Sequence, residues 1–118
     1  MRTRVVIVDD DARFRALARA LLESSGYAVV GEAADGEQAV AAAARVRPDA
    51  ALVDVQLPDT DGFTLARRLV DANHDLRIVL TSMDPTLATP PALAGSGALA
   101  FVPKDELAVT DLAAWLGG

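Results

Sequence analysis

The sequence contains no cysteine, and this absence excludes several kinds of chemistry at once. Disulfide bonds, thiolate metal sites and cysteine nucleophiles all require a residue that the chain does not have. The absence also fits a reducing compartment, and we therefore expect the protein to be cytoplasmic. Any catalytic or metal-binding role has to rest on other side chains.

Long apolar runs and clusters of basic residues are missing as well. Although 52% of the residues are hydrophobic, no apolar run approaches the roughly 20 residues of a membrane-spanning helix. The apolar segment 5–8 is too short for the apolar region of a signal peptide. The formal net charge of −6 argues against a nucleic-acid surface, which needs clustered Lys and Arg. We expect neither a membrane nor a nucleic acid as a partner.

Short apolar segments alternate along the chain with amphipathic helical patterns. Residues 1–118 show no internal repeat and no low-complexity linker, so we expect one domain. The predicted strands are residues 5–8, 27–34, 50–53, 77–80 and 98–102. In the first helical pattern, apolar residues recur at the spacing of a helix face from Phe14 to Leu22. Further helices are predicted over residues 37–46, 63–70 and 109–116, with a short one that opens at Pro90-Pro91.

This alternation predicts a doubly wound α/β fold. Each strand is followed by a helical segment, which favours parallel pairing with helices on both faces of the sheet. The strands are near-continuous apolar runs, as burial on both faces requires. In such sheets ligands bind at the carboxyl ends of the strands, so the residues that follow each strand are the first candidates for a site.

Four of the predicted strands end in side chains that can carry chemistry. They are Asp9-Asp10-Asp11 after the first strand, Asp54 after the third, Thr81 after the fourth and Lys104 after the fifth. In a parallel sheet these groups gather at one edge, where the carboxylates would repel one another. A bound divalent cation removes that conflict, and ligands that are all oxygen atoms favour Mg²⁺.

Each of these residues also has an ordinary structural interpretation. Aspartates after a strand commonly form turns or cap helices, and Asp11 fits a place at the start of the first helix. Thr81 could satisfy a nearby backbone group, and Lys104 could be a solvated surface charge. His74 lies in a polar loop and is interpreted as a surface residue. The joint placement at the strand ends, rather than any single residue, favours a functional site.

Four segments resemble, in order, the receiver domain of bacterial two-component response regulators. They are the acidic pair of Val6-Ile-Val-Asp-Asp10, the acceptor strand and Pro-x-x-Asp-Gly turn of residues 52–62, the hydroxyl strand Ile78-Val-Leu-Thr-Ser82, and residues 97–104 with their aromatic and lysine. The four segments occur in the family's order and together cover essentially the whole chain, which makes the resemblance specific. The resemblance implies a flavodoxin-like parallel sheet with strand order 2-1-3-4-5.

The resemblance also implies a phosphoryl-transfer chemistry for the strand ends. Asp54 is expected to accept a phosphoryl group from a phosphohistidine, on a sensor histidine kinase or a phosphotransfer protein. Mg²⁺ would be bound by the side chains of Asp10 and Asp54 and the backbone carbonyl of Gln56, with Asp9 acting through water. The chain would then be a self-phosphorylating acceptor, with its own dephosphorylation, rather than an enzyme acting on other molecules.

The same resemblance assigns roles to the residues around the acceptor. Lys104 would pair with phosphoryl oxygens and Thr81 would hydrogen-bond to one of them. When Thr81 moves to the phosphoryl group, Phe101 could rotate into the space it leaves, as a two-state switch; the alternative is that Phe101 is simply a core aromatic. The residues expected to tune hydrolysis are Gln56, Ser82 and Met83.

Two features depart from the family pattern. Two prolines, Pro90-Pro91, can only open a helix, so the fourth helix should start there and be short. Pro103 precedes Lys104, whereas many receivers have Lys-Pro, so the cis peptide expected from Lys-Pro is not available. The protein could also form a homodimer when it is phosphorylated, and the sequence leaves this alternative open.

Several rival interpretations stay open. If the chain is complete, it is a stand-alone receiver that signals to a protein partner; otherwise it is the N-terminal receiver of a DNA-binding transcription factor. A small aspartyl-phosphate hydrolase would need a second acid where Gln56 stands. A flavin or nucleotide binder would need a phosphate-cradling loop in place of Asp9-Asp10-Asp11. A receiver that signals without phosphorylation is the last alternative.

Overall fold

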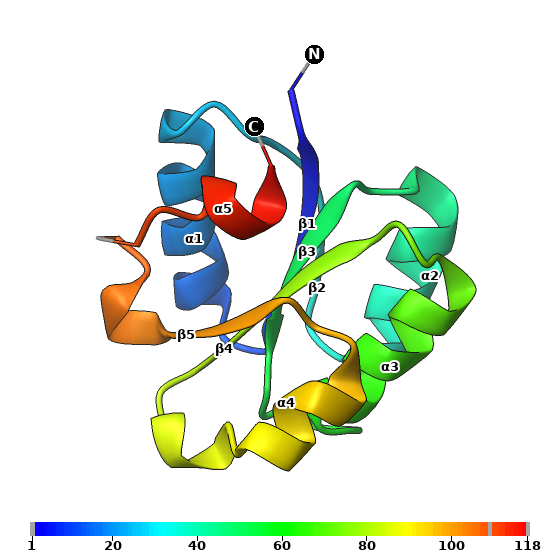
Figure 1. Ribbon diagram of the computed structural model, residues 1–118. Helices are drawn as coiled ribbons and strands as arrows, with labels where there is room; N and C mark the ends of the chain where they lie inside the picture. Colours follow the sequence, from blue (N-terminus) through cyan, green and yellow to red (C-terminus); the bar gives the residue numbers. More distant parts are fainter. Residues whose placement is uncertain (1, 109, 118) are drawn as a thin grey trace.

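Five parallel strands form the centre of the molecule (Figure 1). The computed structural model describes residues 2–108 and 110–117. The strands are β1 (Arg4–Val8), β2 (Ala28–Ala33), β3 (Ala50–Asp54), β4 (Arg77–Ser82) and β5 (Ala100–Pro103). They lie in the order β2-β1-β3-β4-β5, and every pair of neighbours is parallel. The predicted sheet and its strand order are therefore confirmed.

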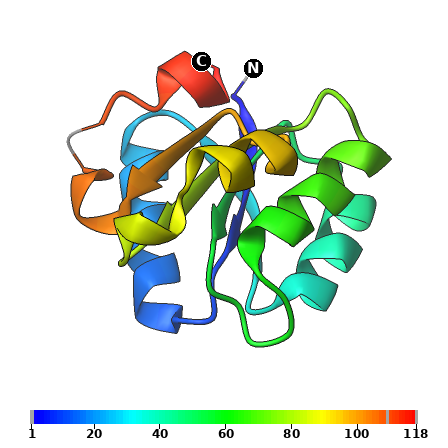
Figure 2. The same cartoon turned by 60° about the horizontal axis from the view of Figure 1, so that its bottom comes forward.

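Helices cover both faces of this sheet (Figures 1 and 2). They are α1 (Ala12–Ser24), α2 (Gly36–Val46), α3 (Gly62–Ala72), α4 (Pro90–Ser96) and α5 (Ala113–Leu116), with 3₁₀ turns η1 (Pro85–Leu87) and η2 (Lys104–Glu106). Residues of α1 and α5 pack on one face, and those of α2, α3 and α4 pack on the other. None of the helices in the described part of the chain has the length and apolar character needed to span a membrane.

Successive residues of each strand point into two separate cores, and this accounts for the apolar runs in the sequence. In β1, Val5 and Ile7 join the core beneath α1 and α5, whereas Val6 and Val8 join the core beneath α2, α3 and α4. All four are at most 1% exposed. Full burial of such a side chain stabilises the fold by about 1.5–3 kcal/mol, so a strand buried on both faces cannot alternate with polar residues.

Aspartates cap three of the helices. The Asp11 carboxylate accepts a hydrogen bond from the Arg13 amide at the start of α1. Asp35 and Asp61 do the same for α2 and α3, each accepting from an amide at 2.8 Å. Such a cap stabilises a helix by about 0.5–2 kcal/mol, and the negative charge suits the positive end of the helix dipole. The helix-start role predicted for Asp11 is confirmed.

The fourth helix also begins where the sequence predicts. Thr89 caps it, Pro90 and Pro91 occupy its first turn, and it ends after seven residues. Gly97 follows with a φ of 77°, which a residue with a side chain rarely adopts. The two prolines cost nothing there because the first amides of a helix have no partner inside it.

The remaining boundaries differ from the predictions. Tyr27 precedes β2, β4 continues through Thr81 and Ser82, and β5 starts at Ala100. The last helix starts only at Ala113, and the predicted position Val109 lies outside the described residues. The reason for the late start is local, because the Asp111 carboxylate accepts from the Ala113 amide and favours a turn over a helix at this point.

The last described residues of the chain are held at the edge of the sheet where the strands begin. The Tyr27 hydroxyl donates to the Gly117 carbonyl at 2.8 Å, and an Arg77 guanidinium nitrogen lies 3.4 Å from the Leu116 carbonyl. Figure 1 shows the N and C labels side by side at that edge. The short α5 is thus fixed by contacts from β4 and from the segment before β2.

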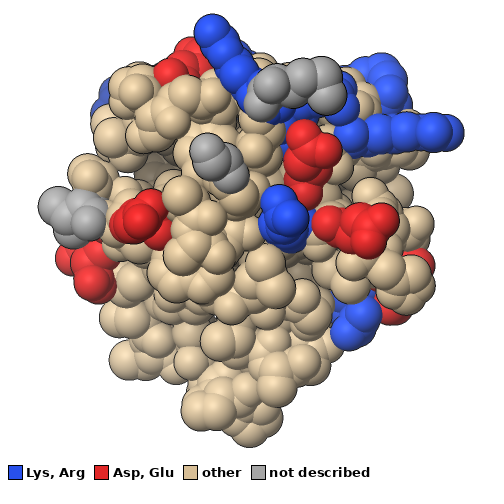
Figure 3. Space-filling model, turned by 45° about the horizontal axis from the view of Figure 1, so that its top comes forward, with Lys and Arg blue, Asp and Glu red and all other residues tan. Residues whose placement is uncertain are grey.

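Charged side chains are unevenly distributed over the surface. Residues 85–103, which carry η1, α4 and β5, include no Lys, Arg, Asp or Glu. Figure 3 shows a broad area without charged side chains in the lower part of the view. Leu99, the residue directly before β5, is 53% exposed. This stretch offers few groups for ion pairs with a partner.

Replacing Gly62 by alanine should destabilise the fold. A Cβ at Gly62 would lie 2.7 Å from the Val55 Cα and closer still to the Asp54 carbonyl, so the backbone of β3 would have to shift. We expect Gly62→Ala to lower the free energy of unfolding by about 2 kcal/mol, measured by urea denaturation. Gly95→Ala is the control, because a Cβ there meets nothing within 4 Å. Equal stability of the two variants would contradict the close contact at Gly62.

Candidate functional site

The strand register brings the predicted polar side chains to one edge of the sheet. Val8 of β1 pairs with Val53 of β3, so Asp9 emerges beside Asp54. Asp54 pairs directly with Thr81 in β4. Thr81 in turn pairs with Val102 of β5, two residues before Lys104. Parallel pairing without an offset is therefore what assembles the site from four separate segments.

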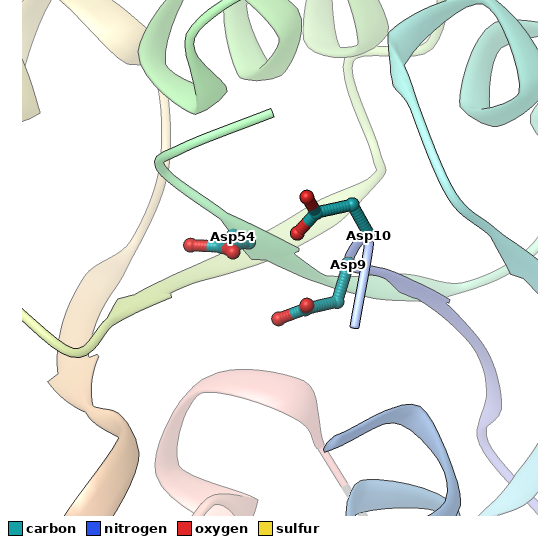
Figure 4. Close-up of side chains that lie close together, drawn as sticks. All are labelled: Asp9, Asp10 and Asp54. Atoms are coloured by element: carbon teal, nitrogen blue, oxygen red, sulfur yellow. The ribbon is translucent and has the colours of Figure 1, made fainter. Parts of the chain in front are cut away.

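Three carboxylates converge at this edge (Figure 4). Asp9, Asp10 and Asp54 each place a carboxylate oxygen within 4.8 Å of the other two. Asp9 is 0% and Asp54 5% exposed, whereas Asp10 is exposed. Oxygen ligands at this spacing, with one side open to solvent, fit a hard divalent cation such as Mg²⁺ that keeps some of its waters.

The ammonium of Lys104 compensates the two buried carboxylates. Its Nζ lies 2.7 Å from Asp9 Oδ2 and 3.4 Å from Asp54 Oδ2, and the side chain is 10% exposed. Burial lowers the pKa of Lys104, but the hydrogen bond to Asp9 and the charge of Asp54 outweigh it, so the net direction is upward. The group is therefore held as a cation, and this placement confirms that Lys104 is not a solvated surface charge.

Burial has the opposite consequence for the pKa of Asp54. Desolvation raises the pKa of this carboxyl, and the charge of Asp9 adds to the effect. The Gln56 amide, which donates to Asp54 Oδ1 at 3.2 Å, and the Lys104 ammonium oppose it without cancelling it. Asp54 is thus a carboxylate poorly stabilised by its surroundings, a condition that a bound cation relieves.

Thr81 differs from its ordinary structural interpretation. Its side chain is fully buried, and its hydroxyl oxygen has no hydrogen-bond partner among the described residues. Asp9 Oδ2, by contrast, is paired with the Lys104 ammonium at 2.7 Å. Leaving a buried hydroxyl unpaired costs about 1–3 kcal/mol, so Thr81 would gain from a ligand that supplies a partner.

The loop between Asp54 and α3 is tied to α2 as well as to its own strand. The Gly62 amide donates to the Val55 carbonyl at 2.7 Å. The Asp59 carboxylate accepts from the amides of Gly36 and Glu37, at 2.8 and 3.1 Å, at the start of α2. The sequence predicts a rigid turn here, but not the partner of Asp59, because the two segments meet only in the folded sheet.

The remaining residues singled out in the sequence lie in different environments. Phe101 is half-buried and packs against the core beneath α2, α3 and α4. Gln56 is exposed and Met83 is 75% exposed, whereas Ser82 is buried and its hydroxyl accepts from the Asp84 amide. His74 is exposed, as expected. The described residues contain no cis peptide, in line with the order Pro103-Lys104.

Two residues of α1, Phe14 and Arg15, belong to the site although the sequence predicts only a helix for this segment. Phe14 places its ring 4.2 Å from the Lys104 ammonium, measured to the ring centroid. Arg15 donates to the Asp9 backbone carbonyl at 2.7 Å and to Glu32 at 3.0 Å. In the sequence Phe14 fits the apolar face of a helix and nothing more. Its contact with the Lys104 ammonium joins segments far apart in the chain, so no local pattern predicts it.

The comparison with known families agrees with this geometry. Residues 5–114 match the model of the response regulator receiver domain. The chain belongs to this family.

Individual relatives of this receiver are longer proteins. It is 42% identical over 104 residues to a protein-glutamate methylesterase/protein-glutamine glutaminase of Anaeromyxobacter dehalogenans, covering 87% of this chain and 29% of that protein. It is 39% identical over 114 residues to the gliding motility regulatory protein of Myxococcus xanthus, covering 95% and 14%. The receiver therefore spans less than a third of the length of either relative, and half the length of a matched transcriptional regulator of Pseudomonas aeruginosa.

A solved structure supports the same assignment. The receiver superposes with a TM-score of 0.84 and 30% identity on a two-component response regulator of the LuxR family from Aurantimonas sp. SI85-9A1. The match covers 92% of this chain and 79% of that one. The five-stranded sheet with helices on both faces is thus the fold of the family.

The contribution of Asp59 should depend on pH. Hydrogen bonds from the Gly36 amide, and then from the Glu37 amide, hold the pKa of Asp59 below its ordinary value. Asp59 therefore stabilises the fold above the usual aspartate pKa of about 3.9, and this stabilisation is lost as the pH falls through the lower folded-state pKa. We expect Asp59→Asn to be less stable than wild type at pH 7, with the difference shrinking on acidification.

Urea unfolding at a series of pH values measures this difference. Asp75→Asn, in an exposed turn, is the matched control and should follow the wild-type pH dependence. A deficit of Asp59→Asn that stays constant down to the acid limit would show that the carboxylate charge is not what anchors the loop.

Proposed function

We propose that Asp54 accepts a phosphoryl group from a phosphohistidine. The single observation that carries the proposal is a buried, destabilised carboxylate whose neighbours are a cation and two further carboxylates. In the transfer, an Asp54 oxygen forms a bond to phosphorus while the phosphorus–nitrogen bond of the donor breaks, and the electron pair returns to the imidazole nitrogen. A carboxylate nucleophile of this kind is an established class.

The carboxylates of Asp9, Asp10 and Asp54, with the backbone carbonyl of Gln56, are the groups we propose to hold Mg²⁺. Asp9 would act through water, because its buried oxygens already lie against Lys104 and the Asp11 amide. When bound, the cation neutralises charge on the transferring group and on the carboxylates around it. The three-carboxylate cluster supports this choice of ligands.

Lys104 and Thr81 are the proposed partners of the transferred group. The ammonium already lies 3.4 Å from Asp54 Oδ2, so it would pair with phosphoryl oxygens attached there. Thr81 lies opposite Asp54 in the register of β3 and β4, and its hydroxyl has no hydrogen-bond partner among the described residues. The hydroxyl would therefore donate a hydrogen bond to a phosphoryl oxygen on Asp54. Movement of Thr81 would vacate space for Phe101, which is only half-buried and can change its exposure.

The partners are proposed from the family and from the surface. The donor would be a sensor histidine kinase or a phosphotransfer protein, and the output would be contact with another protein or a homodimer formed on phosphorylation. The charge-free residues 85–103 suit recognition through apolar contacts. A role as the receiver of a longer DNA-binding regulator is the second candidate, favoured by the LuxR-family neighbour. A cytoplasmic location stays a prediction.

Intact mass after incubation with acetyl phosphate tests the acceptor. With Mg²⁺ we expect a gain of one phosphoryl group, about 80 Da, on wild type and none on Asp54→Asn, because the nucleophile is gone. Omission of Mg²⁺ should abolish or strongly slow the gain. Asp59→Asn is a control that keeps every proposed ligand. An adduct of equal yield on Asp54→Asn would show that another residue is the acceptor.

The lifetime of the phosphoryl group should depend on Gln56 and Met83, two exposed residues that follow the ends of β3 and β4. We expect Gln56→Arg and Met83→Ala to change the dephosphorylation rate by about threefold or more, since each alters access of water to the phosphoryl group. Ser82→Ala should act mainly through the loop that its hydroxyl supports. The rate is followed by loss of the added mass, with Leu99→Ala as the control. Unchanged rates for Gln56→Arg and Met83→Ala would remove both residues from this role.

A further inference from the structure

An aromatic ring from α1 lies against the ammonium of Lys104. The Nζ atom is 4.2 Å from the centroid of the Phe14 ring, within the ~6 Å range of a cation–π interaction. The contact joins the first turn of α1 to the start of η2, two segments that are far apart in the sequence. Since the Lys104 side chain is only 10% exposed, little water screens the attraction.

The ring differs in kind from the other groups around Nζ. Its two other close partners, Asp9 and Asp54, are both among the proposed metal ligands. A cation bound by those carboxylates would compete with Lys104 for their charge, and a phosphoryl group would change the charge on Asp54 itself. The negative face of an aromatic ring is independent of both events, so Phe14 can hold the ammonium in the same place throughout.

Phe14 is itself held firmly. Asp11 caps the start of α1, and Arg15 of the same turn donates to the Asp9 backbone carbonyl at 2.7 Å. The ring is half-buried and packs against the core beneath α1 and α5. The segment that carries Asp9 and the ring that contacts Lys104 are therefore parts of one rigid unit.

We propose that Phe14 is a positioning residue that keeps the Lys104 ammonium aimed at Asp54 during phosphoryl transfer. This inference rests on the proposed function of Asp54. An aliphatic side chain at position 14 would fill the core equally well but would exert no attraction on the ammonium. The chemistry of the ring, rather than its volume, is what the proposal requires.

Substitutions at position 14 separate these two properties. Phe14→Leu should slow Mg²⁺-dependent phosphorylation by acetyl phosphate by about 2- to 30-fold, the range expected for a cation–π contact. Phe14→Tyr and Phe14→Trp, which keep an aromatic face, should stay within about twofold of wild type. Leu17→Ala is the control, because Leu17 lies on the same helix and is 58% exposed. Equal rates for Phe14→Leu and wild type would overturn the proposal.

A double-substitution cycle tests whether Phe14 acts through Lys104. In a Lys104→Ala background, replacing Phe14 by leucine should produce no further change in the phosphorylation rate, because the cation is no longer there. An equal slowing in both backgrounds would mean that the ring serves the core alone, and would overturn the proposal. Thermal unfolding of each variant identifies any general loss of structure.

A second measurement is independent of phosphorylation. In the unphosphorylated, metal-free protein, the ε-methylene protons of Lys104 should show an upfield NMR shift from the Phe14 ring, retained in Phe14→Tyr and lost in Phe14→Leu. Identical shifts in wild type and Phe14→Leu would overturn the inference. A wild-type protein that takes no phosphoryl group while showing the shift would count against the proposed function, with the ring contact confirmed.

Discussion

The contact between the Lys104 ammonium and the carboxylates of Asp9 and Asp54 is the interaction on which the site depends. Two buried acids placed side by side would repel each other, and a buried charge is costly unless it is paired. Lys104 provides the compensation from the position directly after the last β4–β5 pair, Ser82 with Pro103. The parallel register of β1, β3, β4 and β5 is what keeps these charges within reach of one another.

The loop after Asp54 shows how tightly this edge is constrained. Gly62 has no room for a side chain against β3, and Asp61 caps the helix that follows. Asp59 reaches across to the first amides of α2. The loop after β3 is thus linked by hydrogen bonds to α2 and α3, which cover the same face of the sheet. The backbone around Asp54 therefore has little room to move. The Thr81 hydroxyl, which has no partner among the described residues, can form a new hydrogen bond.

Much of this arrangement could be predicted from the sequence. The apolar runs predicted five strands, and the polar residues after them predicted the site, because both depend on local patterns and on the rule that ligands bind at strand ends. The ring contact of Phe14, the partners of Asp59 and the unpaired state of Thr81 could not be predicted, since each is a contact between distant segments. The start of α5 was missed for a smaller reason, the competing turn at Asp111.

The position of the two chain ends has a consequence for how the domain can be used. Tyr27 and Arg77 fix the last residues at the edge where the strands begin, whereas the carboxylates lie where the strands end. A strand of five residues separates the two edges, about 16 Å at the usual rise per residue. A segment attached after the last described residues would therefore leave the domain at the edge of the sheet opposite the carboxylates.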